Sequence, residues 1–389
     1  MLFFLKLLHV ENKMEVHALV CALCVFLCIP PAIVWHSPYV STICIVVFAF
    51  IGLCKYRTLR KNNVTIFGVF LFLYLYFSIS QQYNLFRYGI FILTCSVFLF
   101  KDKFINRIFE SFSRVYSILM IPSIVVFILV LSGFDYLLPS TILDPIEVSK
   151  DHNYVHYPFL VMPDHLTNID YFRFMAFYDE PGVVGTISGL LLFSRRLNFK
   201  DWITYPVLIS GILSMSLTFY VMLVVYILII SNLKTKIWIL FILSVIIALS
   251  YVYVEEYLNM YILERLDFSG GKISGNNRTS ASFDMFFHNF IRNDDHLFFG
   301  YGNSYAKTVN PGGASYKDII VDNGIFFFLA YILSFVTLAL TKLKNINMAF
   351  FVYIITFACV FYQRPFIHTF VYFILLVLPI YGIKYNYKK

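Results

Sequence analysis

Charged residues are scarce in this sequence, and their scarcity is the first constraint on its class. Asp, Glu, Lys and Arg together make up 13% of the 389 residues, whereas a typical soluble domain has about a quarter. Apolar residues make up 60%, and a water-soluble fold could not bury that much Phe, Ile, Leu, Val and Tyr. The composition therefore excludes a set of soluble domains and predicts one integral membrane domain over residues 1–389.

The sequence also lacks the common motifs of nucleotide and hydrolase chemistry. It has no phosphate-binding P-loop, no dinucleotide glycine fingerprint and no Gly-x-Ser-x-Gly elbow. None of its 9 histidines forms a His-x-x-x-His pair on an expected helix, since His152 and His156 lie in a Pro-rich loop. We therefore predict no metal and no cofactor.

Cysteine is missing from the two long polar segments of the chain, so no disulfide framework is predicted. Cys21, Cys24 and Cys28 share one face of an expected helix, where small packing residues are favoured over a metal site. The formal charge of +8 does not indicate nucleic acid, because the basic residues form short clusters between apolar runs. The first ten residues are apolar but lack the features of a secretory signal, and we expect an interfacial segment there.

Apolar runs long enough to cross a bilayer of about 30 Å recur along the chain. They predict an all-α transmembrane bundle of about 12 spans. We expect these spans near residues 16–35, 39–54, 64–80, 85–100, 115–133, 180–194, 203–216, 217–231, 237–254, 319–340, 348–362 and 366–383.

The run 203–231 allows two interpretations, one long tilted helix or two short helices that turn near Ser216 to Phe219. Two helices place every basic cluster on one side of the membrane, and one helix moves the last three clusters across. The positive-inside rule therefore favours two helices, with both termini cytoplasmic. The clusters are Lys55/Arg57/Arg60/Lys61, Lys101/Lys103/Arg107/Arg114, Arg195/Arg196/Lys200, Lys234/Lys236, Lys342/Lys344 and Lys384/Lys388/Lys389.

This topology leaves two large loops, 134–179 and 255–318, on the side away from the cytoplasm. Both contain Pro, Gly, Asn and Asp turn residues, and both keep aromatic residues, so we expect them to be ordered. Loops of this length are usually functional. The sequence therefore predicts an active site at the outer membrane surface.

The first loop runs directly into a membrane helix through residues 172–186. Pro181 suits the first helical turn, and Asp179 or Glu180 can cap the free amides. A helix N-terminus carries partial positive charge, so it could bind a pyrophosphate together with Arg173. The alternative is that Arg173 merely pairs with Asp179 or Glu180.

The second loop contains Arg278 followed by four phenylalanines at helical spacing, Phe283, Phe286, Phe287 and Phe290. We expect a short helix lying on the membrane surface with its apolar face down, and Arg278 at headgroup level. Arg278 would then contact a substrate phosphate or, equally, anchor the helix to lipid phosphate.

Further along, Gly300-Tyr301-Gly302 allows a close approach of two backbones. Asp318 lies where the chain re-enters the membrane, and a helix-start acid is its simpler interpretation. Arg364 lies in a tight outer turn, and Arg87 lies just inside a span near its outer end. Arginines at such positions are functional candidates, with snorkelling to the surface as the alternative.

Taken together, these segments resemble the superfamily of O-antigen polymerases (Wzy-type) and O-antigen ligases, which are integral membrane glycosyltransferases. The resemblance rests on Arg173-Phe-x-x-Phe-Tyr-Asp-Glu180-Pro181-Gly182 entering a helix, and on Ser214-Met215-Ser216 between two short helices. It also rests on Arg278 before an aromatic helix and on the following Phe299-Gly300-Tyr301-Gly302.

The resemblance implies metal-free transfer of an undecaprenyl-diphosphate-linked oligosaccharide at the outer face of the bacterial inner membrane. It implies that Arg173, Arg278 and Arg364 hold the diphosphate, while Glu180 caps the helix or orients Arg173. Members of the superfamily, ligases especially, often carry a His just before the helix that follows the Gly-x-Gly loop. Here Asp318 is the substitute candidate for a general base, and the missing His favours a polymerase. A chain-length regulator protein is a candidate partner.

Two other functions remain as alternatives at this point. The first is an O-antigen ligase, which transfers the lipid-linked glycan to lipid A-core. The second is a polysaccharide flippase or secondary transporter, which would need ionisable residues near the middle of the membrane. The expected spans are nearly free of charge apart from Arg87, whereas charge concentrates in the outer loops, so surface chemistry is favoured over transport.

Overall fold

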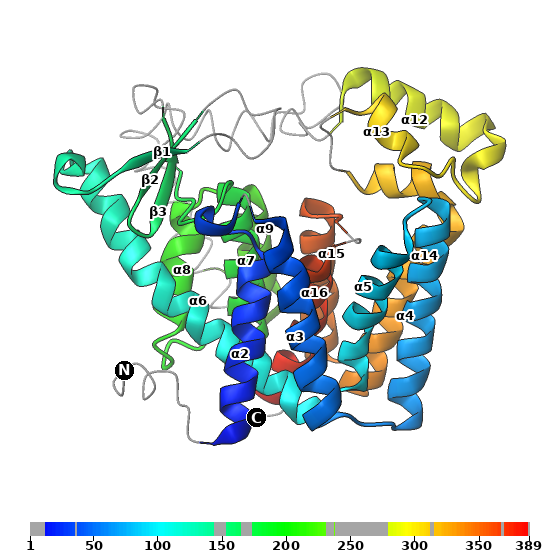
Figure 1. Cartoon of the computed structure of the whole chain (residues 1–389), viewed down its shortest axis with the longest axis horizontal. Coiled ribbons are helices and arrows are strands. Elements are labelled where there is room, and N and C mark those ends of the chain that lie inside the picture. The colour runs from blue at the N-terminus through cyan, green and yellow to red at the C-terminus, as the bar shows by residue number, and fades with distance from the viewer. Residues whose placement is uncertain are drawn as a thin grey trace.

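The computed structural model describes residues 12–35, 37–143, 153–164, 173–230, 237, 279–311, 315–366 and 369–387. Most of these residues are helical, and the long helices run side by side as a bundle (Figure 1). The expected interfacial segment, residues 1–10, lies outside the described residues.

Apolar helices make up the bundle. They are α2 (Lys13–Cys28), α3 (Pro38–Tyr56), α4 (Lys61–Ser80), α5 (Leu85–Cys95), α6 (Asp102–Leu131), α7 (Pro181–Ser194), α8 (Thr204–Leu213), α9 (Leu217–Ile230), α14 (Tyr316–Leu343), α15 (Met348–Gln363) and α16 (Phe370–Asn386). Short turns of 3₁₀-helix connect α2 to α3, as η1 (Ala32–Val34), and α5 to α6, as η2 (Ser96–Leu99). Two more lie outside the bundle helices: η3 (Asp135–Leu137) follows α6, and η6 (Asp295–Leu297) lies within the second large loop.

By length and composition, α3, α4, α6 and α14 can each cross a membrane, and the other bundle helices are shorter but apolar. A helix is present at every expected span except 237–254, which lies outside the described residues apart from Ile237. The chain is therefore a helical membrane protein.

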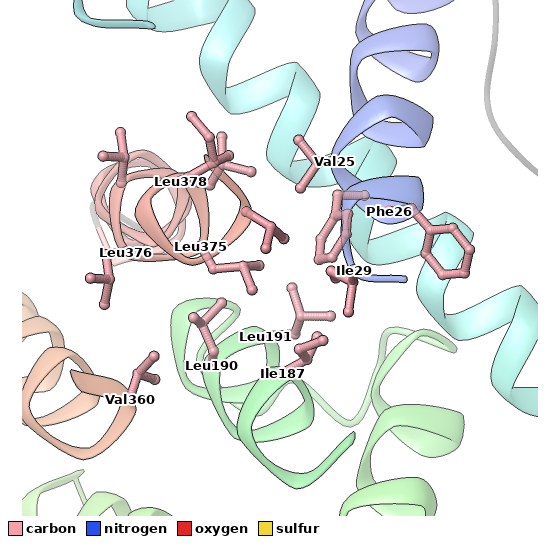
Figure 2. Close-up of a cluster of buried hydrophobic side chains, with 14 of the residues drawn as sticks. Val25, Phe26, Ile29, Ile187, Leu190, Leu191, Val360, Leu375, Leu376 and Leu378 are labelled. Atoms are coloured by element: carbon pink, nitrogen blue, oxygen red, sulfur yellow. The ribbon is translucent and has the colours of Figure 1, made fainter. Parts of the chain in front are cut away.

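The centre of the bundle is formed by α7 and α16, which are buried along nearly their whole lengths. Figure 2 shows Leu190 and Leu191 of α7 near Leu375 of α16, with Ile29, which directly follows α2, and Val360 of α15 at the edge of the cluster. Helices that are apolar all round suit such a position. Close van der Waals packing, more than exclusion of water, holds membrane helices together.

The break predicted within 203–231 is confirmed, and it begins slightly earlier than expected. Helix α8 ends at Leu213, and α9 begins at Leu217. Between them Met215 has a positive φ of 47°, which continues neither helix. The turn is therefore Ser214-Met215-Ser216.

One end of the bundle, which we call the sheet end, carries a small antiparallel sheet (Figure 1). Its strands are β1 (Thr141–Leu143), β2 (Tyr154–Tyr157) and β3 (Leu160–Pro163), in the order β1-β2-β3. The expectation of an all-α chain is therefore wrong for this loop. The physical reason is the run of aromatic and β-branched residues in β2 and β3, which favours pleated structure.

The opposite end, which we call the basic end, gathers several basic clusters around acidic residues. Lys342 Nζ and Lys384 Nζ donate to the two carboxylate oxygens of Asp102, over 2.8 and 2.7 Å. Arg195 forms ion pairs with Glu110 and with a second carboxylate on the α7–α8 connection. Clusters that are distant in sequence therefore lie at the same end of the bundle.

Two further helices, α12 (Ala281–Asn293) and α13 (Tyr305–Val309), cover the sheet end above α14 (Figure 1). The prediction that α12 lays its apolar face on the membrane is wrong. Phe283 and Phe290 are buried against Ile320 and Val321 of α14. The same aromatic spacing serves protein packing here, because α14 presents an apolar surface directly below.

Candidate functional site

The candidate site is built around the first turn of α7. Pro181 occupies its first position, as the sequence predicts, because a missing N–H has no cost there. Glu180 precedes it in an extended conformation and makes no capping hydrogen bond with its side chain. The expectation that Glu180 caps the helix is therefore wrong. Its carboxylate instead accepts a hydrogen bond from Nη2 of Arg364.

Arg364 follows the last residue of α15 and is almost completely buried, with 7% of its side chain exposed, against 42% for Glu180. Burial alone would lower the pKa of Arg364, but Tyr372 and Glu180 outweigh that effect and raise it above its ordinary value. The guanidinium is thus charged in a desolvated position. Its Nε is buried with no hydrogen-bond partner among the described residues.

Neighbouring residues hold the Arg364 side chain against α7. A Cβ at Gly182 would lie 3.1 Å from Nη2 of Arg364 and 3.1 Å from Nε2 of Gln363. Thr218 at the start of α9 donates to Oε1 of Gln363 over 2.7 Å. The start of α7 therefore lies beside this guanidinium, and the start of α9 contacts the neighbouring Gln363 at the end of α15.

Arg173 reaches the same region from the loop before α7. It donates from Nε to the Ser214 carbonyl over 3.3 Å and from Nη2 to the Met215 carbonyl over 3.1 Å. Carbonyl groups at the end of a helix lack partners and carry partial negative charge, so a cation is favoured there. Arg173 therefore stabilises the turn that separates α8 from α9.

Gly185 brings that turn against α7. A Cβ at Gly185 would lie 2.3 Å from Ser216 Cβ and 2.9 Å from Ser214 Oγ. Gly182 and Gly185 lie one turn apart on α7, so Arg364 and the turn held by Arg173 flank the same helix start. The predicted residues Arg173, Glu180 and Arg364 are thus brought together around α7.

The electrostatics of this arrangement favour an anion. A helix N-terminus already carries partial positive charge, and a guanidinium placed beside it adds to that charge. Glu180 offsets part of it from a more exposed position. A phosphate approaching from the sheet end would meet strong, potentially bidentate donors.

Asp318 lies apart from this cluster, at the start of α14. It forms a capping box with Ser315, accepting from the Ser315 N–H over 2.8 Å, and it accepts from Asn310 Nδ2 over 3.1 Å. This geometry matches the helix-start interpretation. Its role as a general base stays a prediction. Arg278 lies outside the described residues.

The close backbone approach predicted for Gly300-Tyr301-Gly302 is confirmed. A Cβ at Gly300 would lie 2.4 Å from the Asp322 carbonyl oxygen, and one at Gly302 would lie 2.7 Å from the Ser80 carbonyl oxygen. Both glycines have positive φ, at 76° and 70°. The loop therefore joins the end of α4 to α14 without side chains in between.

Asp322 is a residue that the sequence analysis missed. It lines a cavity of about 290 Å³ together with Asp318, Arg87 and Lys307. Its spacing of four residues from Asp318 places both carboxylates on one helix face, and that spacing could have pointed to it. Pro365 and Phe366, which directly follow Arg364, form part of the same wall.

No family model, no curated protein and no solved structure matches this chain.

Proposed function

We propose that this chain polymerises undecaprenyl-diphosphate-linked oligosaccharide repeat units into O-antigen or a related surface polysaccharide at the outer face of the bacterial inner membrane. The observation that supports this most is the buried Arg364, paired with Glu180 at the start of α7 and next to the turn that Arg173 holds. Two guanidiniums at a helix N-terminus suit a diphosphate leaving group.

The proposed topology has twelve spans, with both termini and the basic end in the cytoplasm. Basic residues are retained on the cytoplasmic side of membrane proteins. The convergence of Lys342, Lys384 and Arg195 on acidic residues at one end of the bundle agrees with that orientation. The sheet end, with the two large loops, then lies outside the cytoplasm.

In the proposed reaction, a hydroxyl oxygen of the acceptor repeat attacks the anomeric carbon of the donor sugar. The bond from that carbon to the phosphate oxygen breaks, and undecaprenyl diphosphate leaves with the bonding electrons. Arg173, Arg364 and Arg278 stabilise the charge that develops on the diphosphate. Asp318 takes the proton of the acceptor hydroxyl.

Glu180 has a positioning role in this proposal. Because Arg364 is buried, its guanidinium needs a fixed partner to keep one orientation. Glu180 provides that partner through its carboxylate, and its partial exposure leaves the ion pair open to an incoming phosphate. A diphosphate would therefore compete with Glu180 for Arg364. Among the described residues, the hydrogen bond to Glu180 is the one that it would replace at the Arg364 guanidinium.

The proposal is tested on surface polysaccharide from a strain that lacks this gene, complemented with wild type or Arg173→Ala. Gel electrophoresis should show the long ladder collapse to a single repeat on lipid A-core without the gene. Wild type should restore the ladder, and normally expressed Arg173→Ala should not. Loss of all attached repeats, with long lipid-linked polymer accumulating, would indicate a ligase. An unchanged ladder would refute the O-antigen assignment.

A further inference from the structure

We propose that a groove at the sheet end of the bundle binds a membrane lipid carrying a phosphate and a hydroxyl-rich head, with Arg87 as the phosphate contact. A polymerase must hold two lipid-linked substrates at once, and we assign this lipid as the second of them. That assignment alone rests on the proposed function.

The groove consists of two cavities that meet at one side chain. The first has a volume of about 400 Å³ and lies between the end of α2 and the starts of α3, α5 and α16. The second has a volume of about 290 Å³ and lies between the end of α4, α13 and the start of α14. Arg87 on the first turn of α5 lines both cavities, so its side chain lies between them.

The walls of the first cavity are mostly apolar. Ile45 and Phe91 are buried at its base, whereas Phe86 is 62% exposed at its edge. These residues lie on bundle helices, so a hydrocarbon chain from the surrounding bilayer can cover Phe86 and enter between α3 and α5. The chemistry of this cavity suits an acyl or polyprenyl chain and offers little to a free sugar or ion.

The second cavity is more polar than the first, and two carboxylates line it. Asp322 Oδ1 accepts from the backbone N–H of Ala306 over 2.7 Å, and Asp318 lies one helical turn before it. Gln81 is held in place by Ser304, whose backbone N–H and Oγ each donate to Gln81 Oε1 over 2.8 Å. Carboxylates accept hydrogen bonds from hydroxyl groups and repel a second anion. This cavity therefore suits a hydroxyl-rich head.

Arg87 lies where these two environments meet, and no acid of the described residues forms a direct ion pair with it, although Asp318 and Asp322 line the same cavity. Its guanidinium lies 4.7 Å from the centroid of the Tyr83 ring. Within the described part of the chain, no carboxylate lies within ion-pair distance of Arg87, whereas Arg195 has two carboxylate partners and Arg364 has one. A cation near the membrane surface without an acidic partner complements a phosphate.

The groove also lies next to the proposed diphosphate site. Pro365 and Phe366 line the polar cavity directly after Arg364, and Tyr372 lines the apolar one. The rings of Phe366 and Tyr372 lie 5.4 Å apart. Pro365, Phe366 and Tyr372 thus form a wall next to Arg364, and two lipid-linked substrates could lie on its two sides.

The test is a binding titration of the purified full chain in lipid nanodiscs, with undecaprenyl phosphate as the probe and native mass spectrometry as the readout. We expect Arg87→Ala to weaken binding about tenfold, the loss of one charge-assisted contact. Arg292→Ala removes an equal charge from the exposed end of α12 and should change binding less than about twofold. Equal binding by wild type and Arg87→Ala would overturn the proposal.

A second variant tests the hydrocarbon part of the groove while leaving Arg87 in place. Thr42 of α3 lines the apolar cavity, and Thr42→Trp should fill it and weaken binding of undecaprenyl phosphate. Inorganic phosphate should not compete with the lipid for wild-type protein. Effective competition by inorganic phosphate would identify a free-anion site and overturn the proposal, as would unchanged lipid binding by Thr42→Trp.

The lipid-binding test and the polysaccharide-ladder test can refute the groove and the polymerase function separately. If deletion of the gene leaves the ladder unchanged while lipid binding depends on Arg87, the polymerase function is refuted and the lipid-binding groove is supported. If the ladder depends on the gene while wild type and Arg87→Ala bind the lipid equally, the lipid-binding groove is refuted and the polymerase function is supported.

Discussion

Arg364 donates a hydrogen bond from Nη2 to the Oε2 atom of Glu180, a residue 184 positions earlier in the chain. The bond joins the end of α15 to the start of α7, so two membrane helices are connected by one ion pair at the sheet end. Its two members differ in environment, since the Arg364 side chain is 7% exposed and the Glu180 side chain 42%. Glu180 therefore anchors a charge that could not otherwise stay buried.

The first prediction concerns this pair. Glu180→Ala leaves the guanidinium of Arg364 without its carboxylate, and we expect the free energy of unfolding to fall by about 2 kcal/mol. Glu180→Gln keeps a hydrogen-bond acceptor, so its free energy of unfolding should fall less than that of Glu180→Ala. Thermal unfolding of the purified protein in detergent measures both. Equal unfolding temperatures for wild type and Glu180→Ala would show that the pair has no structural role.

The second prediction concerns the contact between α7 and the α8–α9 turn. Gly185→Ala places a Cβ 2.3 Å from Ser216 Cβ, so the turn must move and the carbonyl acceptors of Arg173 move with it. We expect a loss of about 1–3 kcal/mol, the typical cost of overpacking. Gly68→Ala in α4 is the matched control, because no atom lies within 4 Å of its added Cβ. A control less stable than Gly185→Ala would contradict this interpretation.

The third prediction concerns Gly324, where α14 changes direction. Its φ is 81°, and an added Cβ would lie 2.1 Å from the Phe298 carbonyl oxygen. With ψ at 166° this backbone conformation is open essentially to glycine alone, and it strains an L residue by about 1–3 kcal/mol before any clash is counted. Gly324→Ala should therefore lower the unfolding temperature more than Gly89→Ala, whose Cβ meets no atom within 4 Å. Similar unfolding temperatures for Gly324→Ala and Gly89→Ala would contradict this prediction.

These glycines show what the sequence could predict and what it could not. Pro181 at the start of α7 and the close approach at Gly300 and Gly302 follow from local preferences. The turn between α8 and α9 follows from the distribution of basic clusters along the chain. The pairing of Arg364 with Glu180 does not, because residues so distant in sequence meet only through the packing of complete helices. Local charge patterns instead suggested a cap by Glu180, which is wrong.

The wrong prediction for the aromatic face of α12 has a similar cause. Phenylalanines at helical spacing predict an apolar face, but they do not identify what covers it. The structure covers Phe283 and Phe290 with α14, whose own apolar residues the sequence analysis had assigned entirely to a membrane span. The cavity residue Asp322 was overlooked for the same reason, since it lies inside that expected span.

The fourth prediction concerns pH. Burial would raise the pKa of Asp294, but hydrogen bonds from Tyr301 and His296 outweigh it and lower the pKa below its ordinary value. A lowered pKa in the folded state stabilises the protein above about pH 4, and the contribution is lost as the pH falls through the folded pKa. Asp294→Asn should therefore reduce the unfolding temperature at pH 7 and have little effect near pH 3. An equal reduction at both pH values would contradict the assignment.

The most direct test of the central claim uses purified protein and lipid-linked repeats extracted from a strain that lacks this gene. In nanodiscs with EDTA present, wild type should convert single undecaprenyl-diphosphate-linked repeats into a ladder. Arg364→Ala should slow this conversion by about 100-fold, as expected for loss of a group that stabilises leaving-group charge. Arg292→Ala should match wild type. Repeats that stay single with folded, monodisperse wild-type protein would contradict the account.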